Sequence, residues 1–398
     1  MNICFLSKTF HYLRGGIESY TFNIAQALTK QGHNAHIITW EGDGQYHLER
    51  YKGVYIHKLT YPIEPFRGSW RIDKFFPFLD LRHSYIVSKF LSKVIKEYSI
   101  DIVESPDWLY EGLYFAYSKR RNIPLVVRLH GHISVFRYYL QKKSIGLNTL
   151  LRLKLERKLA QKADILTTNS EFYANFISKV WNIDRSFIRI IPTGIDVNLF
   201  TPKYFKNNNE IKILYVGRLE ENKGVGVISE VISRICSEFP NVVFLFIGQN
   251  KKCEGSNFTW RDYIRYKTGE CNVIFFDPIS TKELIKFYQQ SQICIFPSIF
   301  EAFGMVVLEA MACGKPVIVT RVGAFPEIVV NDVNGILISP ENSEELLRAI
   351  KRLLCDEMLR EKLGENARKT IEEKFSLNKM IQQTLSLYRE TIDRFRKS

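Results

Sequence analysis

The stretch PSIFEAFGMVVLEAMACGKPVIVT (Pro297–Thr320) decides the fold of this chain more clearly than any other. It has the pattern of a loop, a short apolar helix and a buried strand in succession. Gly304 stands at the start of the apolar helical run, and Gly314 and Pro316 end it. Residues 317–319 then have the composition of a buried strand. A helix that begins at Gly304 presents free backbone N–H groups and the positive end of its dipole, which suits a phosphate group.

Two carboxylates, Glu301 and Glu309, flank the predicted start of this helix. Glu301 comes just before it, and Glu309 lies about a turn and a half inside it. Carboxylates in these two places can bracket a polyhydroxylated ligand. A pair of glutamates alone more often belongs to a capped core helix with two surface acids, but the whole string favours a ligand site.

Short apolar runs alternate with amphipathic stretches along the whole chain. The predicted strands are Ile3–Ser7, Ala35–Thr39, Val54–Leu59, Ile102–Glu104, Leu125–Leu129, Ile165–Asn169, Ile188–Ile191, Lys212–Val216, Val242–Ile247, Asn272–Phe276, Ile293–Phe296, Val317–Thr320 and Gly335–Ile338. Helical patterns such as Glu18–Gln31 and Leu377–Lys397 separate or follow them. This alternation indicates mostly parallel sheets covered on both faces. Because 398 residues are comfortable for two cores, the sequence predicts an α/β chain with two Rossmann-like domains, whose ligands bind at the carboxyl ends of strands.

The composition is that of a globular chain, with 45% hydrophobic and 25% charged residues. No run approaches the ~18 apolar residues of a membrane-spanning helix, and the opening MNICFLSKTF lacks the features of a secretory signal. The seven cysteines are scattered and form no CxxC pair. They favour buried thiols in a reducing cytosol over a disulfide framework or a zinc site.

Positive charge is concentrated in the first half of the chain. Residues 1–205 hold 29 Lys and Arg against 17 Asp and Glu, which is +12 of the total net charge of +14. Residues 119–162 carry twelve basic side chains and a single acid, Glu156. Such a patch indicates an anionic partner: nucleic acid, anionic lipid or an acidic substrate.

A loop with two cations, GRLEENKG (Gly217–Gly224), directly follows the predicted strand Lys212–Val216. Arg218 and Lys223 can clamp the two phosphates of a diphosphate, the arginine in bidentate fashion and the lysine as a point charge. Gly217 would let the backbone come close to such a ligand. Taken alone, however, the loop is more often an ordinary solvated turn.

Two further elements lie in the first half. Gly15 and Gly16 precede a predicted helix, in a pattern that fits either a tight structural turn or a phosphate loop.

His130 lies at the carboxyl end of the predicted strand Leu125–Leu129. A lone histidine is usually structural. Since His130 and His132 have no evident third ligand, a metal site is not expected.

The string PSIFEAFGMVVLE resembles the donor-site signature of retaining GT-B glycosyltransferases, specifically glycosyltransferase family 4. That signature is Pro-Ser-x-x-Glu-x-Phe-Gly, with a second acid eight positions after the first. The Gly217–Gly224 loop is similar to the family's Gly-Arg…Lys-Gly element, and the segment from Gly15 through Gly32-His33 is similar to its opening. Two departures occur: Asp277-Pro278 and Ala324 stand where the family usually has glycine.

The resemblance implies a GT-B architecture, in which two Rossmann-like domains with mostly parallel sheets face a central cleft. Residues 1–195 would form the acceptor-binding domain and residues 205–375 the nucleotide-sugar-binding domain. Residues 376–398 would form a helix that crosses back to the first domain. Two such lobes imply closure before chemistry.

The resemblance also assigns roles. Glu309 would hold the ribose hydroxyls and Glu301 the transferred sugar, which His130 would contact from the other domain. The residues expected to bind the donor are Gly15, Gly16, Gly217, Arg218, Lys223, Gly248, Phe303, Gly304, Met305, Val306 and Glu309, and those expected to act in catalysis are His130, Glu301, Arg218 and Lys223. The cations would neutralise the departing UDP or GDP in place of a divalent metal. We therefore expect no metal and no cofactor besides the nucleotide-sugar substrate.

The acceptor and the location of the protein follow from the charge pattern. The stretch Arg137–Lys162 sets leucines among cations, which suits an interfacial helix on anionic lipid and equally a solvated helix whose leucines pack inward. These leucines include Leu140, Leu147, Leu150, Leu151, Leu153 and Leu155. We expect a cytoplasmic enzyme that is peripheral on the inner face of the plasma membrane, with a glycan or lipid-linked acceptor in cell-surface polysaccharide synthesis.

Two alternatives remain open from the sequence. A nucleotide-sugar epimerase of the same fold would convert its substrate with no acceptor present. A nucleic-acid-binding protein is favoured by charge alone, but it requires aromatic side chains interleaved with the cations and gives Glu301 and Glu309 no role.

Overall fold

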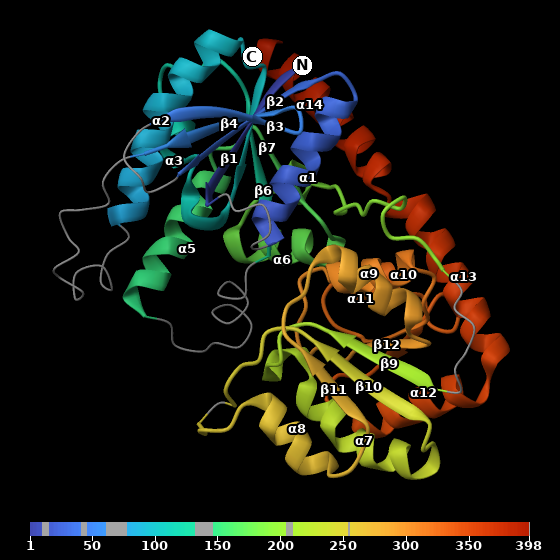
Figure 1. Cartoon of the computed structure of the whole chain (residues 1–398). Helices are drawn as coiled ribbons and strands as arrows, with labels where there is room; N and C mark the ends of the chain where they lie inside the picture. Colours follow the sequence, from blue (N-terminus) through green and yellow to red (C-terminus); the bar gives the residue numbers. More distant parts are fainter. Residues whose placement is uncertain are drawn as a thin grey trace. The chain divides into compact units, whose positions relative to one another are not determined.

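The computed structural model describes residues 1–9, 16–40, 46–60, 78–131, 146–203, 210–253 and 255–397. The chain divides into two compact units (Figure 1). The first contains residues 1–193 and 380–398, and the second contains residues 194–379. In the described ranges, no helix is long and apolar enough to cross a lipid bilayer.

The first unit is built on a sheet with the strand order β3-β4-β2-β1-β5-β6-β7-β8. The strands are β1 (Asn2–Thr9), β2 (Asn34–Trp40), β3 (His47–Tyr51), β4 (Val54–Leu59), β5 (Ile102–Pro106), β6 (Leu125–Leu129), β7 (Ile165–Thr168) and β8 (Ile188–Ile190). Neighbouring strands run parallel except for the pair β3 and β4, which is antiparallel.

Helices on both faces of the first sheet complete this unit (Figure 1). They are α1 (Gly16–Lys30), α2 (Phe78–Tyr98), α3 (Leu113–Ala116), α5 (Leu147–Ala160), α6 (Glu171–Trp181) and α14 (Leu377–Lys397), with the 3-10 turns η1 (Trp108–Tyr110) and η2 (Arg185–Phe187). Capping explains where α6 begins and ends. Ser170 accepts a hydrogen bond from the backbone N–H of Tyr173, and Asn182 ends the helix in the left-handed conformation.

The second unit has a sheet with the strand order β11-β10-β9-β12-β13-β14, in which every pair is parallel. Its strands are β9 (Ile211–Val216), β10 (Val242–Ile247), β11 (Val273–Phe276), β12 (Ile293–Phe296), β13 (Val317–Thr320) and β14 (Ile336–Ile338). Its helices are α7 (Val225–Glu238), α8 (Trp260–Thr268), α9 (Thr281–Gln290), α10 (Met305–Ala312), α11 (Phe325–Ile328), α12 (Ser343–Cys355) and α13 (Glu357–Lys374), with the 3-10 turn η3 (Glu221–Lys223).

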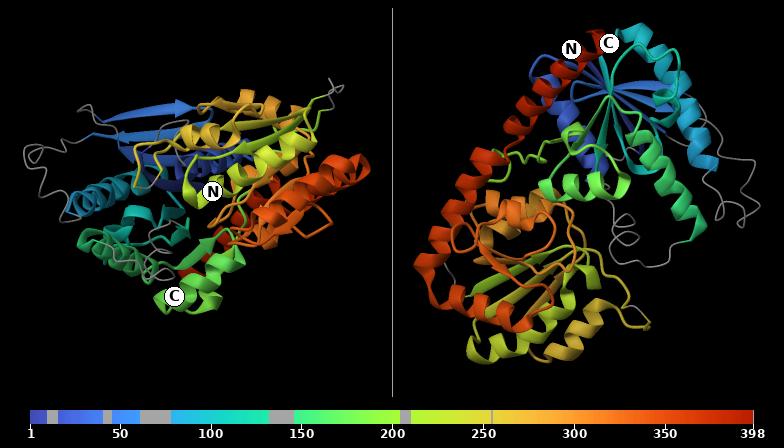
Figure 2. Two further views of the ribbon diagram at one scale, coloured as in Figure 1. Left: turned by 90° about the horizontal axis from the view of Figure 1, so that it is seen from below. Right: turned by 180° about the vertical axis from the view of Figure 1, so that it is seen from behind.

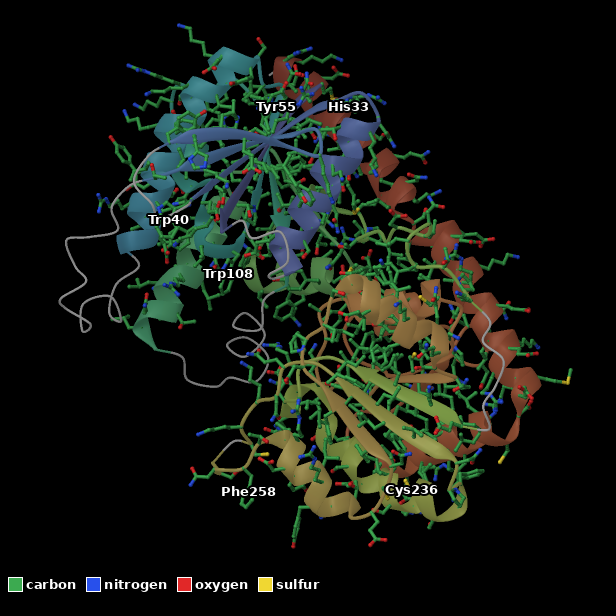
Figure 3. All side chains as sticks on the ribbon, in the orientation of Figure 1. His33, Trp40, Tyr55, Trp108, Cys236 and Phe258 are labelled. Atoms are coloured by element: carbon green, nitrogen blue, oxygen red, sulfur yellow. The ribbon has the colours of Figure 1, made fainter. Side chains whose placement is uncertain are left out.

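Two layers of core fill the space on either side of the second sheet. Successive side chains of a strand point to opposite faces, so Ile213 and Tyr215 of β9 pack with α7, α8 and α12. Leu214 and Val216 pack on the other face with α9, α10 and α13. Figures 2 and 3 show these helices on the two sides of the sheet and the side chains between them. This packing fixes the loops at the strand ends.

The structure confirms the predicted α/β fold of two mostly parallel sheets. The bounds of β4, β6, β10, β12 and β13 are those expected from the apolar runs, and α10 begins one residue after Gly304. The strand β3 (His47–Tyr51) was not predicted. It is an antiparallel edge strand of mixed polarity and carries no apolar run.

Candidate active site

Four loops of the second unit are joined at the carboxyl edge of its sheet. These loops follow β9, β10, β12 and β13. Ile299 donates its backbone N–H to the carbonyl of Asn222 at 2.9 Å, which ties the loop after β12 to the one after β9. The hydroxyl of Thr320 donates to the carbonyl of Ser298 at 2.5 Å, which ties the end of β13 to the loop after β12. The predicted phosphate loop and the predicted sugar loop are therefore neighbours.

An ion pair joins the two predicted loops directly. Lys223 Nζ donates to Glu301 Oε2 at 2.7 Å. The two side chains keep 23% and 14% of their surface exposed, so both groups can still reach a ligand in solvent. The structure thus brings together one predicted phosphate-binding cation and the predicted sugar-binding acid.

Arg218, the other predicted cation, is held through its backbone, and its guanidinium group is exposed to solvent. The buried Tyr215 donates its hydroxyl to the carbonyl oxygen of Arg218 at 2.7 Å. The guanidinium lies 2.8 Å from Glu220 Oε1, and the arginine side chain is 55% exposed. Because exposed ion pairs contribute little, the guanidinium can exchange Glu220 for another anion.

The helix α10 begins at this edge with a conformation that requires glycine. Gly304 has a φ of 97°, in the left-handed region. A Cβ atom there would lie 2.3 Å from Cε1 of Phe325. The first-turn amides of Met305 and Val306 have no acceptor within a helix, and the positive end of the helix dipole adds to them. Phe303 packs its ring into the core, so only its backbone remains for the predicted contact.

Glu309 lies inside α10 and is held by a tyrosine from α9. The hydroxyl of Tyr288 donates to Glu309 Oε2 at 2.9 Å. Burial raises the pKa of the Glu309 carboxyl to about 7, although this hydrogen bond opposes the rise. No pattern in the sequence pointed to Tyr288, because its spacing from Ile285 on α9 is that of a core residue.

Gly248, at the end of β10, has a packing role that explains its identity. The backbone N–H of Gly217 donates to the carbonyl of Ile247 at 2.9 Å. A Cβ atom on Gly248 would lie 2.0 Å from the carbonyl oxygen of Gly217. The two glycines therefore let the loops after β9 and β10 touch through their backbones.

Both departures from the family pattern have local partners. Asp277 accepts from Arg261 Nη2 at 3.0 Å, which joins the loop after β11 to α8. Ala324 is fully buried at the start of α11. Within the described residues, no hydrogen bond or ion pair joins Asp277 or Ala324 to the Lys223–Glu301 pair, and the turn at Ala324 packs without the usual glycine.

His130 is positioned within the first unit, where it follows β6. Its backbone N–H donates to Asp107 Oδ1 at 3.1 Å. Its ring packs edge-on against Tyr20, with the ring centroids 5.3 Å apart. Gly16 begins α1, whereas Gly15 and His132 lie outside the described residues.

A buried network next to His130 was not foreseen from the sequence. Glu104 of β5 accepts from Tyr20 at 3.0 Å and from Tyr388 of α14 at 2.6 Å. The guanidinium carbon of Arg128 lies 4.2 Å from the centre of the Tyr20 ring. Burial raises the pKa of Glu104, while the charge of Arg128 opposes the rise. A carboxylate inside the apolar run of β5 was the one available signal.

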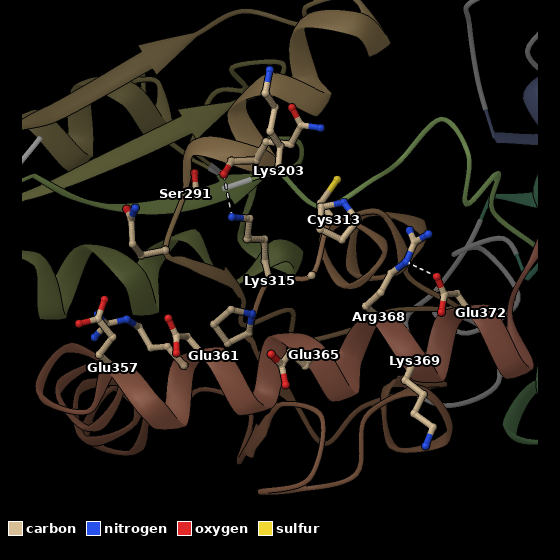
Figure 4. Close-up of a pocket in the computed structure, with 16 residues that line it drawn as sticks. Lys203, Ser291, Cys313, Lys315, Glu357, Glu361, Glu365, Arg368, Lys369 and Glu372 are labelled. Atoms are coloured by element: carbon tan, nitrogen blue, oxygen red, sulfur yellow. Dashed lines mark hydrogen bonds and ion pairs between the residues drawn. The ribbon is translucent and has the colours of Figure 1, made fainter. Parts of the chain in front are cut away.

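A groove of about 500 Å³ lies at the opposite, amino-terminal edge of the second sheet (Figure 4). It is lined by residues that precede β12 and β13 and by α13. Lys315 Nζ donates to the carbonyl of Gln289 at 2.7 Å there, and Arg368 pairs with Glu372 at 2.6 Å. None of the predicted site residues lines this groove, so it is separate from the candidate site.

Metal ligands do not gather in the described part of the chain: no three His, Cys, Asp or Glu side chains form a group that could hold an ion. The expectation of metal-independent chemistry stays a prediction.

Two family models match this chain. The model described as "Glycosyltransferase Family 4" matches residues 14–199, and the one described as "Glycosyl transferases group 1" matches residues 196–370. Between them they span both units. The chain belongs to this family of retaining glycosyltransferases, enzymes that transfer a sugar from a nucleotide sugar.

Individual proteins support the same family and fold. An uncharacterized glycosyltransferase of Methanocaldococcus jannaschii is 25% identical over 400 residues, which is 94% of each chain. Sucrose-phosphate synthase from Thermosynechococcus elongatus has a TM-score of 0.79 and 23% identity over 99% of each chain. HepE from Anabaena, solved in complex with UDP-glucose, has a TM-score of 0.72 and 19% identity over 99% of this chain and 100% of that one. The predicted GT-B fold is confirmed by these structures.

Proposed function

We propose that the carboxyl edge of the second sheet binds the donor, a UDP- or GDP-linked hexose, and that the enzyme transfers this sugar to a glycan or lipid-linked glycan. The observation that carries the proposal is the 2.7 Å pair between Lys223 and Glu301 beside the start of α10. It sets a cation suited to phosphate next to an acid suited to sugar hydroxyls. The complex of the similar HepE with UDP-glucose favours UDP as the nucleotide.

Donor binding would rearrange this pair. An ammonium group has three donors, so Lys223 can turn toward a phosphate oxygen while Arg218 grips the diphosphate from the exposed side. The Glu301 carboxylate, partly released, then accepts hydrogen bonds from the sugar hydroxyls. The pair therefore couples recognition of the leaving group to recognition of the transferred sugar.

The first turn of α10 and Glu309 would bind the rest of the nucleotide sugar. The amides of Met305 and Val306 suit a phosphate or sugar oxygen. Tyr288 donates to Glu309 Oε2, so Oε1 would accept from the ribose hydroxyls. In this arrangement Tyr288 orients the carboxylate without touching the ligand.

The reaction breaks the bond between the anomeric carbon and the diphosphate oxygen, whose electron pair stays with the nucleotide. The acceptor oxygen bonds to the same face of that carbon, and its proton passes to a phosphate oxygen of the donor. Charge therefore develops on the diphosphate, where Arg218 and Lys223 would stabilise it. The contributions of His130, Gly15 and Gly16 in the first unit stay predictions from the resemblance, to be tested by substitution in the same assay.

We also propose that the acceptor is a growing or lipid-linked cell-surface polysaccharide and that the enzyme is peripheral on the cytoplasmic face of the plasma membrane. The net charge of +12 in residues 1–205 supports this location, because anionic lipid attracts basic segments.

Calorimetric titration with UDP, GDP and their hexose conjugates, followed by turnover of the tightest one, tests the proposed donor site. The double variant Arg218→Ala/Lys223→Ala should lower turnover by about a hundredfold or more, since each cation stabilises developing charge. The control Arg348→Ala/Lys362→Ala removes two exposed charges from α12 and α13 and should leave turnover unchanged. Full activity of the first variant, or loss of activity on adding a chelator, would overturn the metal-independent mechanism. Conversion of the nucleotide sugar to an isomer without acceptor would indicate an epimerase.

A further inference from the structure

A group of tyrosines and lysines lies on three helices of the first unit and on the residues just after two of them. The helices α2, α3 and α5 lie side by side (Figure 1). The rings of Tyr85 and Tyr114 pack edge to face with centroids 5.4 Å apart. Lys89 Nζ lies 5.6 Å from the centre of the Tyr85 ring, and Lys162 Nζ lies 5.4 Å from that of Tyr117. We call this group, with Lys158 one turn before Lys162, the tyrosine–lysine surface.

The tyrosines of this surface are exposed to solvent. Tyr85, Tyr114 and Tyr117 expose 49%, 43% and 50% of their area. Tyr114 and Tyr117 are three residues apart and so share one side of a helical turn. Three large aromatic side chains that gather on one face, instead of scattering, mark an interaction site.

The charges around these tyrosines are almost all positive. In residues 78–131 and 146–162, the exposed cations are Arg82, Lys89, Lys93, Lys96, Lys119, Arg120, Lys154, Lys158 and Lys162. Glu97 is the only exposed acid in the same ranges. On α2 the spacing from residue 82 through 85, 89 and 93 to 96 keeps these side chains on one face of the helix. A surface of this kind attracts an anionic partner.

Three acids in the same ranges, Asp80, Glu111 and Glu156, are buried instead of lying among the exposed lysines. Asp80 pairs with Lys8 and, at 3.0 Å, with Arg152. Glu111 accepts from the backbone N–H of Lys8. Glu156 is buried. The fold therefore neutralises its acids inside and presents its lysines outside.

The leucines of α5 do not form a lipid-facing side. Leu153 and Leu159 are buried and Leu150, Leu151 and Leu155 are half-buried, whereas Leu147 is 56% exposed. The sequence allowed two interpretations of this segment, and one of them was an interfacial helix that inserts its leucines into lipid. That interpretation does not fit the described part of the segment.

We infer that the tyrosine–lysine surface docks the enzyme on an anionic lipid bilayer. The inference rests on the proposed function, in which the acceptor is a growing or lipid-linked polysaccharide and the enzyme is peripheral on the membrane. Tyrosine prefers the interface between membrane and water, since its ring is apolar and its hydroxyl polar. Lysines next to it extend their ammonium groups to the lipid phosphates while their stems cover the rings. The ammonium groups and the tyrosine rings would thus both lie at the level of the lipid headgroups.

Single-stranded nucleic acid is the other partner with matching charge, and the geometry favours it less. Base stacking requires an open ring face. Lys89 covers one face of Tyr85, and Lys162 covers one face of Tyr117. Tyr114 is already packed against Tyr85. The rings are better disposed to meet headgroups with their edges than bases with their faces.

Flotation with vesicles tests this surface in the full-length enzyme. Wild type should bind vesicles of phosphatidylglycerol and phosphatidylethanolamine and not those of phosphatidylcholine, and binding should weaken with salt. The variant Lys89→Gln/Lys158→Gln/Lys162→Gln should bind about a hundredfold more weakly, since each lysine near an anionic surface contributes about fivefold. The control Lys267→Gln/Lys362→Gln/Lys374→Gln removes three exposed lysines from the second unit, one of which also lies near a tyrosine ring. It should bind as wild type does.

A second pair of variants separates ring insertion from charge. Tyr114→Ser/Tyr117→Ser should lower vesicle affinity without changing its salt dependence, whereas Tyr266→Ser, at a residue 85% exposed, should have no effect.

Equal binding by the lysine variant and its control, or tighter binding to an oligonucleotide than to the anionic vesicles, would overturn the inference. Hydrolysis of the donor in solution is measured in parallel: its absence in wild type would refute the donor site, and lost vesicle binding with intact hydrolysis would refute the docking surface alone.

Discussion

Glu309 holds a carboxyl group that burial makes costly to ionise. Its folded pKa is about 7 against an ordinary value of 4.5, so the folded protein keeps a proton that the unfolded chain releases between these values. The retained proton therefore stabilises the folded protein fully below pH 4.5, and this stabilisation is lost as the pH rises through 7. The free energy of unfolding falls by at most about 3 kcal/mol over this range. Retaining a destabilising carboxylate here is consistent with a role in binding.

The variant Glu309→Gln separates these two effects. The glutamine still accepts from Tyr288 and carries no charge, so the second unit should be more stable than wild type by about 1–3 kcal/mol at pH 8 and equally stable at pH 4. Donor affinity should fall about tenfold, because a charged acceptor is lost. Thermal unfolding at the two pH values and calorimetric titration measure both. Unchanged donor affinity would remove Glu309 from the site.

The position of single residues was predictable where they lie in a loop after a strand. Arg218 and Lys223 lie in the loop after β9, as expected, and their binding of a diphosphate stays a prediction from the resemblance. Tyr288 was not predictable, because its partner Glu309 is 21 residues away. Nor was the bond between Glu104 and Tyr388, which are 284 residues apart. Hydrogen bonds between distant segments depend on packing that no local pattern encodes.

Among the strands, those that the sequence predicted with the correct bounds are buried at most of their positions. The runs that became β10 (Val242–Ile247) and β13 (Val317–Thr320) are buried at every position, and a strand covered on both faces shows a continuous apolar run. β3 (His47–Tyr51) lies at an edge, is partly exposed along its length and has no such run. The start of α10 was predictable because glycine precedes an apolar helical pattern.

The start of α10 also gives a sharp test of why glycine stands there. Gly304→Ala should destabilise the second unit by about 2–4 kcal/mol, since the left-handed conformation and the Phe325 ring both oppose a Cβ atom. Gly226→Ala is the matched control, because its Cβ atom would meet the Trp260 ring at an ordinary 3.7 Å inside α7. That change should stabilise by about 0.5–1 kcal/mol. Urea unfolding measures both, and similar effects would contradict the packing argument.

The last helix of the chain, α14, belongs mainly to the first unit. α14 begins in the second unit, but its residues from Met380 onward belong to the first. Tyr388 donates from this helix to the buried Glu104 of β5. The resemblance implied a crossing helix; the residues that anchor it became evident only in three dimensions.

Because of the hydrogen bond from Tyr388 to Glu104, a substitution in the carboxyl-terminal helix α14 should destabilise the sheet of the first unit. Tyr388→Phe leaves Glu104 without one of its donors and should destabilise the first unit by about 1–3 kcal/mol. Amide hydrogen exchange should accelerate in β5 and α1, while β9 to β14 keep their protection.

The reciprocal control is Tyr288→Phe, which removes the same hydroxyl from a buried tyrosine that serves a glutamate of the second unit. It should accelerate exchange around α9 and α10 and leave β5 unchanged. Because each unit has its own core, the two substitutions should act separately and their effects should add in the double variant. Acceleration throughout both units by either change alone would show that the chain unfolds as one cooperative body, and the assignment of α14 to the first unit would then explain nothing about its stability.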